Sequence, residues 1–112
     1  MDNPRLQRLF DFLKKAPNDA FTLYSIAYEY QQKEEWSEAQ KYFEQLKSLH
    51  PDYIGLYYHL GAVLERQEQV EQAINIYKEG IALAQQKRER HALSELQRAL
   101  NTALGMDDED DW

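Results

Sequence analysis

The sequence contains no cysteine, which excludes disulfide bonds, thiol chemistry and zinc sites built on cysteine. Proline and glycine are scarce, with three and four copies in 112 residues, whereas an all-β protein needs many turns. No apolar run approaches the roughly 18 residues needed to cross a bilayer, and no signal-peptide stretch follows the first residues. We therefore expect a cytoplasmic protein with no membrane partner.

Basic charge is also in short supply. The net charge is −7, and five of the negative charges lie in residues 107–111, which leaves the rest of the chain at −2. A nearly neutral body with an acidic end offers no basic face for phosphate groups, so we expect no nucleic-acid partner. Residues 106–112 are expected to form a disordered, acidic tail. The alternative is a tail that docks, with Trp112 in an apolar pocket.

Motifs for catalysis and for metal binding are missing as well. None of the three histidines, His50, His59 and His91, has a partner at i+3 or i+4 that would complete a metal site. The sequence has no phosphate-binding glycine loop, no H-E-x-x-H and no G-x-S-x-G. We therefore expect no enzymatic activity, no cofactor and no metal.

Helical periodicity is what the sequence has in abundance. Apolar residues recur at i, i+3, i+4 and i+7 from the first segment onward, in Leu6, Leu9, Phe10 and Leu13. The pattern predicts an all-α protein of about six helices with short connections. Ser37 and Asp52 are candidate N-caps of the third and fourth helices, and Gly105 is a natural stop for the sixth.

The helical pattern repeats with a period of 34 residues. Small residues match small and large match large in the pairs Ile26 and Leu60, Ala27 and Gly61, Tyr30 and Leu64, Ala39 and Ala73, Phe43 and Tyr77, and Pro17 and Pro51. Small side chains at Ala27 and Gly61 would let the two helices of a unit approach closely. Such internal repetition predicts stacked helix pairs, each of which buries its apolar face against the next.

This unit resembles the tetratricopeptide repeat, whose signature is W-x2-L-G-x2-Y, then A-x3-F, then P. The first unit reads Leu23-x2-Ile26-Ala27-x2-Tyr30, then Ala39-x3-Phe43, then Pro51. The second reads Tyr57-x2-Leu60-Gly61-x2-Leu64, then Ala73-x3-Tyr77, with Gln85 in place of the proline.

The resemblance implies a tetratricopeptide-like α-solenoid, a right-handed superhelical array of antiparallel helix pairs over residues 1–105. Its expected parts are an N-terminal half-repeat helix 4–16, repeat one 20–53, repeat two 54–87 and a capping helix 88–105. The first helix resembles the second half of a repeat, because Leu9, Phe12 and Pro17 match Phe43, Leu46 and Pro51. The sixth resembles a first half if two residues are inserted, which puts Gln97 at the small-residue position.

In the resembled family, the first helix of each pair lines a concave groove that binds extended peptides or partner helices. Carried over, the resemblance implies a partner-binding groove of Phe21, Tyr24, Tyr28 and Gln31 in repeat one and Tyr58, His59, Ala62 and Glu65 in repeat two. Some family members grip a C-terminal carboxylate with groove lysines, arginines and asparagines. Because Tyr24, Tyr28 and His59 occupy such positions here, we expect no such clamp. The alternative reading is that some of these rings only complete packing between helices.

Two functions from different classes follow. The first is a non-catalytic adaptor or scaffold that binds a peptide or a helix of a partner protein through the aromatic groove. The second is a structural subunit, or a homodimer, that uses its convex face or its capping helix and has no peptide ligand.

Overall fold

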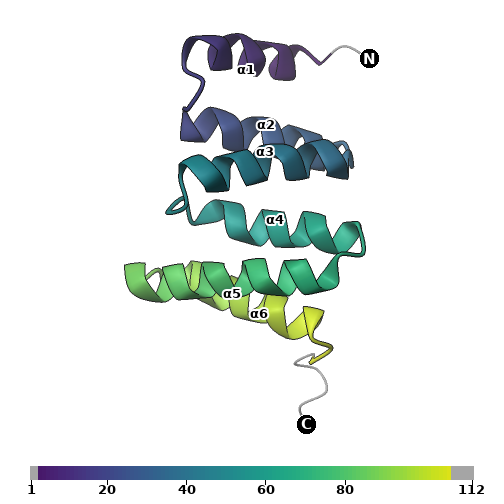
Figure 1. Cartoon of the computed structure of the whole chain (residues 1–112), viewed down its shortest axis with the longest axis vertical. Helices are drawn as coiled ribbons and strands as arrows, with labels where there is room; N and C mark the ends of the chain where they lie inside the picture. The colour runs from purple at the N-terminus through teal and green to yellow at the C-terminus, as the bar shows by residue number, and fades with distance from the viewer. Residues whose placement is uncertain (1–2, 107–112) are drawn as a thin grey trace. The chain divides into compact units, whose positions relative to one another are not determined.

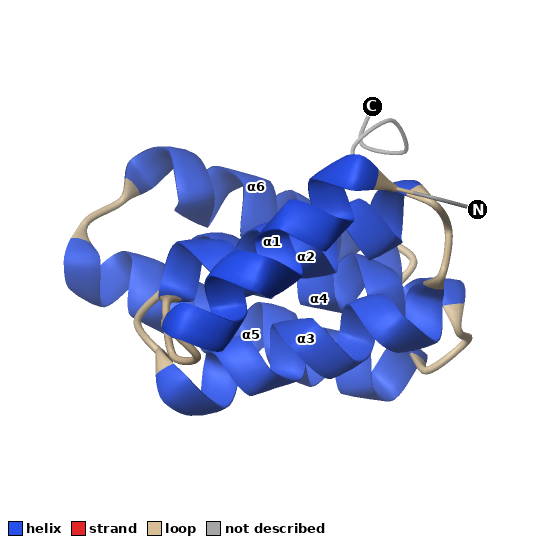
Figure 2. Ribbon diagram, turned by 90° about the horizontal axis from the view of Figure 1, so that it is seen from above, coloured by secondary structure: helices blue, strands red, loops and turns tan. Residues whose placement is uncertain are grey.

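Every regular element of the protein is an α-helix in residues 3–106, the range that the computed structural model describes (Figures 1 and 2). Six helices follow one another in that range: α1 Pro4–Lys15, α2 Ala20–Gln32, α3 Trp36–Leu49, α4 Gly55–Arg66, α5 Val70–Lys87 and α6 Arg90–Ala103. The all-α, six-helix prediction is confirmed, while the superhelical handedness stays a prediction. The predictions about the acidic residues 107–111 and about Trp112 lie outside the described residues.

The helices fall into two compact units, residues 1–56 and 57–112. The first unit is held together by α2 against α3, and its core consists of the fully buried Leu23, Ile26, Ala27, Ala39, Phe43 and Leu46. The helix α1 packs on α2 through the buried Leu6. The Phe10 ring adds contacts with Tyr30 and Tyr42, at centroid distances of 6.5 and 6.0 Å. The repeat positions Ile26, Ala27, Ala39 and Phe43 therefore belong to the core of this unit, whereas Leu6 is the only buried residue of the periodic stripe predicted for the first helix.

The second unit depends on small residues at its helix contacts. The buried Gly61 of α4 lies against the Tyr77 ring of α5, and a Cβ built at Gly61 would sit 2.1 Å from Tyr77 Cε1. At Gly80, a Cβ would sit 2.7 Å from the Cβ of Tyr57 and 3.0 Å from Leu96 Cδ1 of α6. Any larger side chain at these positions would push the helices apart, so glycine is what allows both contacts.

Side chains cap the first two helices but not the third. Asn3 Oδ1 accepts from the Leu6 N–H at 3.1 Å, and Asp19 Oδ2 accepts from the Thr22 N–H at 2.9 Å. The prediction of Ser37 as an N-cap is wrong, because α3 already begins at Trp36 and its N-cap is Glu35. The prediction of Asp52 is wrong too, since α4 begins three residues later, at Gly55.

The turn between α2 and α3 explains why α3 begins before Ser37. In the turn after α2, Glu34 has φ 60°, and the Glu35 N–H donates to the Tyr30 carbonyl at 2.9 Å. Because this left-handed turn closes at Glu35, the next helix can start at once. The turns after α4 and α5 repeat it, with Glu68 at φ 63° and Arg88 at φ 58°. Gly105 has φ 80° after α6, which confirms the predicted helix stop.

We predict that Gly61→Ala destabilises the protein by about 1–3 kcal/mol, because the added methyl group collides with the buried Tyr77 ring. The higher helix propensity of alanine offsets part of this cost. The matched control is Gly55→Ala, where the added Cβ would meet its nearest atoms at 3.7 Å, an ordinary contact. Urea unfolding measures both variants, and equal stability of the two would contradict the prediction.

We also predict that Glu34→Gly and Glu68→Gly each stabilise the protein by about 0.5–1 kcal/mol. Both residues hold a left-handed backbone conformation. This conformation is unfavourable for a residue with a Cβ atom and carries no such cost for glycine. Part of the gain is lost to the greater freedom of glycine in the unfolded chain. The urea midpoint should rise for both variants and should not rise for Glu34→Ala, which keeps the Cβ atom.

Candidate partner-binding surface

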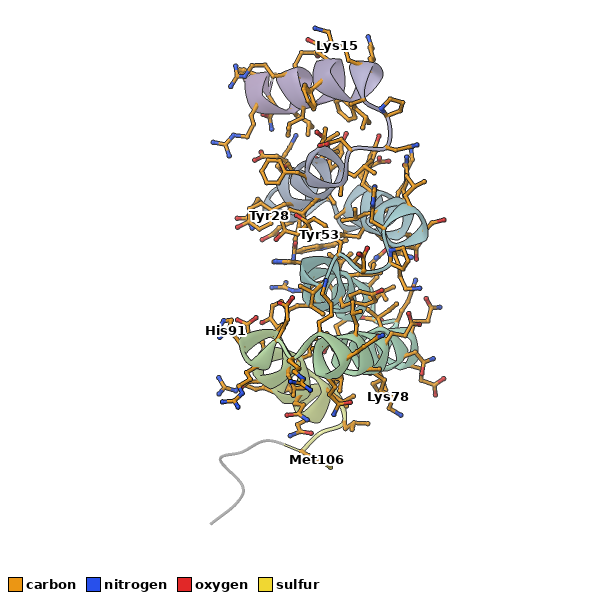
Figure 3. All side chains as sticks on the ribbon, turned by 90° about the vertical axis from the view of Figure 1, so that its left-hand side faces the viewer. Lys15, Tyr28, Tyr53, Lys78, His91 and Met106 are labelled. Atoms are coloured by element: carbon orange, nitrogen blue, oxygen red, sulfur yellow. The ribbon has the colours of Figure 1, made fainter. Side chains whose placement is uncertain are left out.

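The predicted groove residues of α2 form an aromatic row on the first unit. The side chains of Phe21 and Tyr28 are 67% and 38% exposed. Tyr24, which lies between them in the sequence, is half-buried. The Tyr24 and Tyr28 rings stack at 6.3 Å with an interplanar angle of 12°, because residues four apart lie on one face of a helix. The Tyr53 ring lies 5.4 Å from the Tyr24 ring, and Figure 3 shows Tyr53 near Tyr28.

Tyr24 also contributes to the core of this unit. Its ring meets the buried Phe43 edge-on at 6.1 Å. Burial raises the pKa of the Tyr24 phenol, and the neighbouring phenols of Tyr53 and Tyr28 raise it further. The hydroxyl therefore stays protonated at neutral pH and can donate a hydrogen bond. Tyr24 supports the aromatic row from below, whereas Phe21 and Tyr28 offer most of the accessible ring surface.

Gln31 ends the α2 row with an unusual polar atom. Its side-chain Oε1 is buried and accepts no hydrogen bond from any residue in the described part of the chain. A buried acceptor without a donor costs about 1–3 kcal/mol. A ligand that brings a hydrogen-bond donor to Gln31 Oε1 would therefore bind more favourably.

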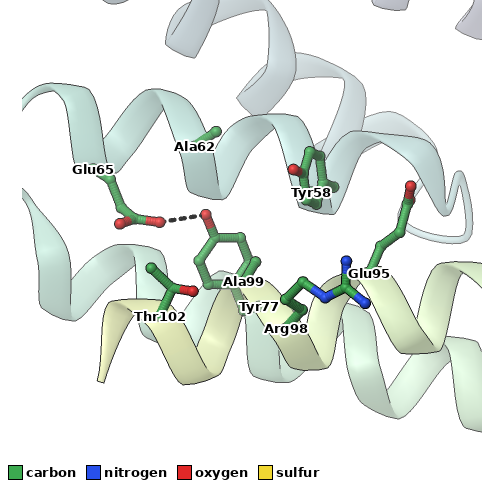
Figure 4. Close-up of a pocket in the computed structure, with 8 residues that line it drawn as sticks. All are labelled: Tyr58, Ala62, Glu65, Tyr77, Glu95, Arg98, Ala99 and Thr102. Carbon is green, nitrogen blue, oxygen red and sulfur yellow. Dashed lines mark hydrogen bonds between the residues drawn. The ribbon is translucent and has the colours of Figure 1, made fainter. Parts of the chain in front are cut away.

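The predicted residues of α4 border a pocket in the second unit. Three of them, Tyr58, Ala62 and Glu65, line a pocket of about 350 Å³ together with Tyr77, Glu95, Arg98, Ala99 and Thr102 (Figure 4). Tyr58 is 41% exposed. His59 lies beside the pocket rather than in its wall, with its ring at 5.6 Å from that of Tyr58 and nearly perpendicular to it.

The pocket wall contains acidic side chains, Glu65 and Glu95, and one basic side chain, Arg98. The acidic side chains have partners within the described part of the protein, and the basic one does not. The Tyr77 hydroxyl donates to Glu65 Oε2 at 2.5 Å. Burial raises the pKa of the Tyr77 phenol far above its usual range, and the hydrogen bond to Glu65 raises it further, so Tyr77 remains a donor. Glu95 Oε2 lies 3.2 Å from His91 Nε2, and the two side chains form an ion pair when the imidazole is protonated. Arg98, in contrast, has neither an ion pair nor a hydrogen bond with any residue of 3–106.

Sequence reasoning missed Arg98 because α6 was expected to act only as a cap. The signal was available: with the two-residue insertion that aligns α6, Arg98 falls at the repeat position of Tyr28 and Ala62. The structure groups the eight predicted residues in two sets, one on α2 in the first unit and one on α4 in the second. It adds Tyr77 and four α6 residues to the second set.

Two further observations bear on chemistry. Within the described residues, no three side chains of the His, Cys, Asp or Glu type come together as metal ligands. None of the helices there combines the length and the apolar character that spanning a membrane requires.

The tetratricopeptide-repeat family profile matches residues 30–100. The crystal structure of a tetratricopeptide repeat domain protein from Salinibacter ruber is similar, with 40% identity, a TM-score of 0.74 and coverage of 80% of this chain and 100% of that one. A protein from Bordetella parapertussis shares the fold at 21% identity and a TM-score of 0.81, with coverage of 99% and 96%. MamA shares it at 17% identity and a TM-score of 0.66, with coverage of 95% and 68%. A search of curated proteins gives no match.

We predict that His59 makes stability depend on pH just below neutrality. Burial lowers the pKa of the His59 imidazole, and the Glu95 carboxylate opposes this shift. As the pH falls below about 6.5, the unfolded chain takes up a proton at this residue before the folded chain does, so stability falls. The variant His59→Gln should lose less stability between pH 7.5 and 5.5 than the wild type does in urea unfolding. A flat profile in the wild type, or an unchanged slope in His59→Gln, would contradict the assignment.

Proposed function

The chain belongs to the tetratricopeptide-repeat family, and from this premise we propose that it binds a peptide or a helix of a partner protein through the aromatic side chains of α2 and α4. Tetratricopeptide repeats are in general protein–protein interaction modules, and solenoids of this kind present concave surfaces to their ligands. The function needs no catalytic residue and no cofactor.

The observation that carries the proposal is the exposure of aromatic rings on the first helix of both repeats. Phe21, Tyr28 and Tyr58 remain between 38% and 67% exposed although the equivalent face of each helix could have carried polar side chains. A ring left in water contributes little to folding. When a partner covers it, the same ring adds buried apolar area to the interface. A ring has few rotatable bonds, so little side-chain entropy is lost. Tyrosine hydroxyls can in addition bond a peptide backbone.

The polar groups of the two sets suggest the chemistry of the ligand. Arg98 is a cation that no described residue neutralises, and it lines the same pocket as Tyr58. Gln31 Oε1 needs a donor such as a backbone N–H. Both features fit an apolar or aromatic segment that also carries an acidic side chain. A clamp for a C-terminal carboxylate uses several basic and amide side chains, whereas the described wall of this pocket has Arg98 alone. The acidic group of the ligand can therefore be a side chain rather than its C-terminus.

We predict that the triple variant Phe21→Ala, Tyr28→Ala, Tyr58→Ala binds such a segment at least about tenfold more weakly than the wild type. Tyr24 is left in place because it packs on Phe43. Ligands are first selected with the wild type from a displayed library of random 15-residue peptides. Fluorescence anisotropy of the labelled winners then measures the dissociation constants.

The matched control is Leu49→Ala, Val70→Ala, which removes two equally exposed apolar side chains, 40% and 41%, outside both sets. It should bind like the wild type. A double-mutant cycle between Arg98→Gln and removal of the acidic residue of the peptide tests the charge pairing. If no peptide is enriched, or if the folded triple variant retains full affinity, the structural-subunit function replaces the proposal.

A further inference from the structure

A carboxylate in the pocket of the second unit has no cationic partner among the described residues. Glu65 of α4 lines this pocket and is partly buried, and within residues 3–106 no lysine, arginine or histidine forms an ion pair with it. A carboxylate that is partly removed from water without an opposite charge nearby is less stable than one that is paired. A cation brought by a ligand would therefore bind here favourably.

The Tyr77 side chain fixes the position of this carboxylate. Its hydroxyl donates to Glu65 Oε2 at 2.5 Å (Figure 4), and its ring is 1% exposed and packs against Gly61. The hydroxyl supplies one hydrogen bond, whereas a carboxylate has about four acceptor sites. The remaining sites of Glu65 stay available to the donors of a ligand. Because the carboxylate is already held in place, pairing costs it little conformational entropy.

The opposite charge lies at the other end of the pocket. Figure 4 shows Glu65 toward one end, and Arg98 and Glu95 toward the other. Tyr58, near the Arg98 end, and Glu65 are seven residues apart on α4, which corresponds to about 10 Å along the helix axis. Arg98 forms no ion pair with either carboxylate of the described pocket wall. The pocket thus presents separate sites for a cation and for an anion.

The middle of the pocket is suited to an apolar stem. Ala62 of α4 and Ala99 of α6 lie between the two charged ends (Figure 4), and their small side chains leave room in a pocket of about 350 Å³. The Tyr58 ring, which is 41% exposed, adds an apolar wall. The methylene groups of a lysine or an arginine can cover such a surface while the charged end reaches a carboxylate.

We propose that Glu65 binds a lysine or arginine side chain of the partner segment, while Arg98 binds an acidic side chain of the same segment. This pairing rests on the proposed function, because the ligand is the same segment. An extended chain rises by about 3.3 Å per residue, so the two charged residues are about three positions apart. Their order along the segment sets the direction in which it binds. A segment with acidic residues alone leaves Glu65 unpaired and binds more weakly.

A comparison of the wild type with Glu65→Gln tests the pairing. Glutamine keeps a carbonyl oxygen that accepts from the Tyr77 hydroxyl, and it removes the charge. Both proteins select ligands from the same displayed library of random 15-residue peptides. The winners of the wild type should carry a lysine or arginine at a constant spacing from an aspartate or glutamate. The winners of Glu65→Gln should keep the acidic residue and lose the preference for the basic one.

A double-mutant cycle then measures the pairing itself. In a winner of the wild type, norleucine replaces the basic residue, which keeps an apolar stem and removes the charge. In fluorescence anisotropy, this exchange should weaken binding to the wild type about fivefold and binding to Glu65→Gln less than about twofold. The effect on the wild type should shrink as sodium chloride rises from about 50 to 500 mM, because salt screens the charges.

The matched control is Glu71→Gln, which removes the same charge from an exposed residue of α5 outside the pocket. This variant should select the same kind of peptide and bind it like the wild type. Two results would overturn the role of Glu65 and leave the proposed function standing. One is a set of winners without a basic residue, and the other is a set that the triple variant fails to bind but that Glu65→Gln binds as tightly as the wild type. If the wild type enriches no peptide, both proposals fail.

Discussion

The close approach of Gly61 to the Tyr77 ring is the contact on which the second unit depends. No room remains for a Cβ atom at Gly61, so the Tyr77 ring of α5 packs directly on the backbone of α4. The Tyr77 hydroxyl then donates to Glu65, four residues further along α4, at 2.5 Å. Ala27 and Phe43, both fully buried, are the equivalent pair in the first unit. The core and the pocket thus depend on the same contact, in which a small residue on one helix makes room for an aromatic ring from the next.

This contact also explains why aromatic rings remain for a partner. Tyr57, Leu60, Gly61 and Leu64 supply the packed stripe of α4, so Tyr58 and Ala62, which follow Tyr57 and Gly61, are not needed in the core. The same holds on α2, where Ile26 and Ala27 are buried and Tyr28 is exposed. Each first helix therefore has one stripe for folding and another for binding. The proposed function uses only the second stripe.

The fold could be predicted almost entirely because it depends on periodicity and on residue size, both of which are local. The candidate site could be predicted only in part. Tyr58, Ala62 and Glu65, predicted from their repeat positions, line the pocket, but Arg98 was missed because α6 was expected to act only as a capping helix. Helix starts were also missed at Ser37, since a left-handed Glu34 starts α3 earlier than a capping side chain would. Backbone conformation at a non-glycine residue leaves little trace in a sequence.

Photocrosslinking from the exposed tyrosines of α2 and α4 tests the central claim most directly. A benzophenone amino acid replaces Tyr28 or, in a second variant, Tyr58, and both proteins are irradiated in living cells. The account predicts a discrete crosslinked partner protein common to both positions, absent when the same amino acid replaces the equally exposed Leu49. Crosslinks from Tyr28 and Tyr58 that are no stronger or more selective than those from Leu49 would contradict it.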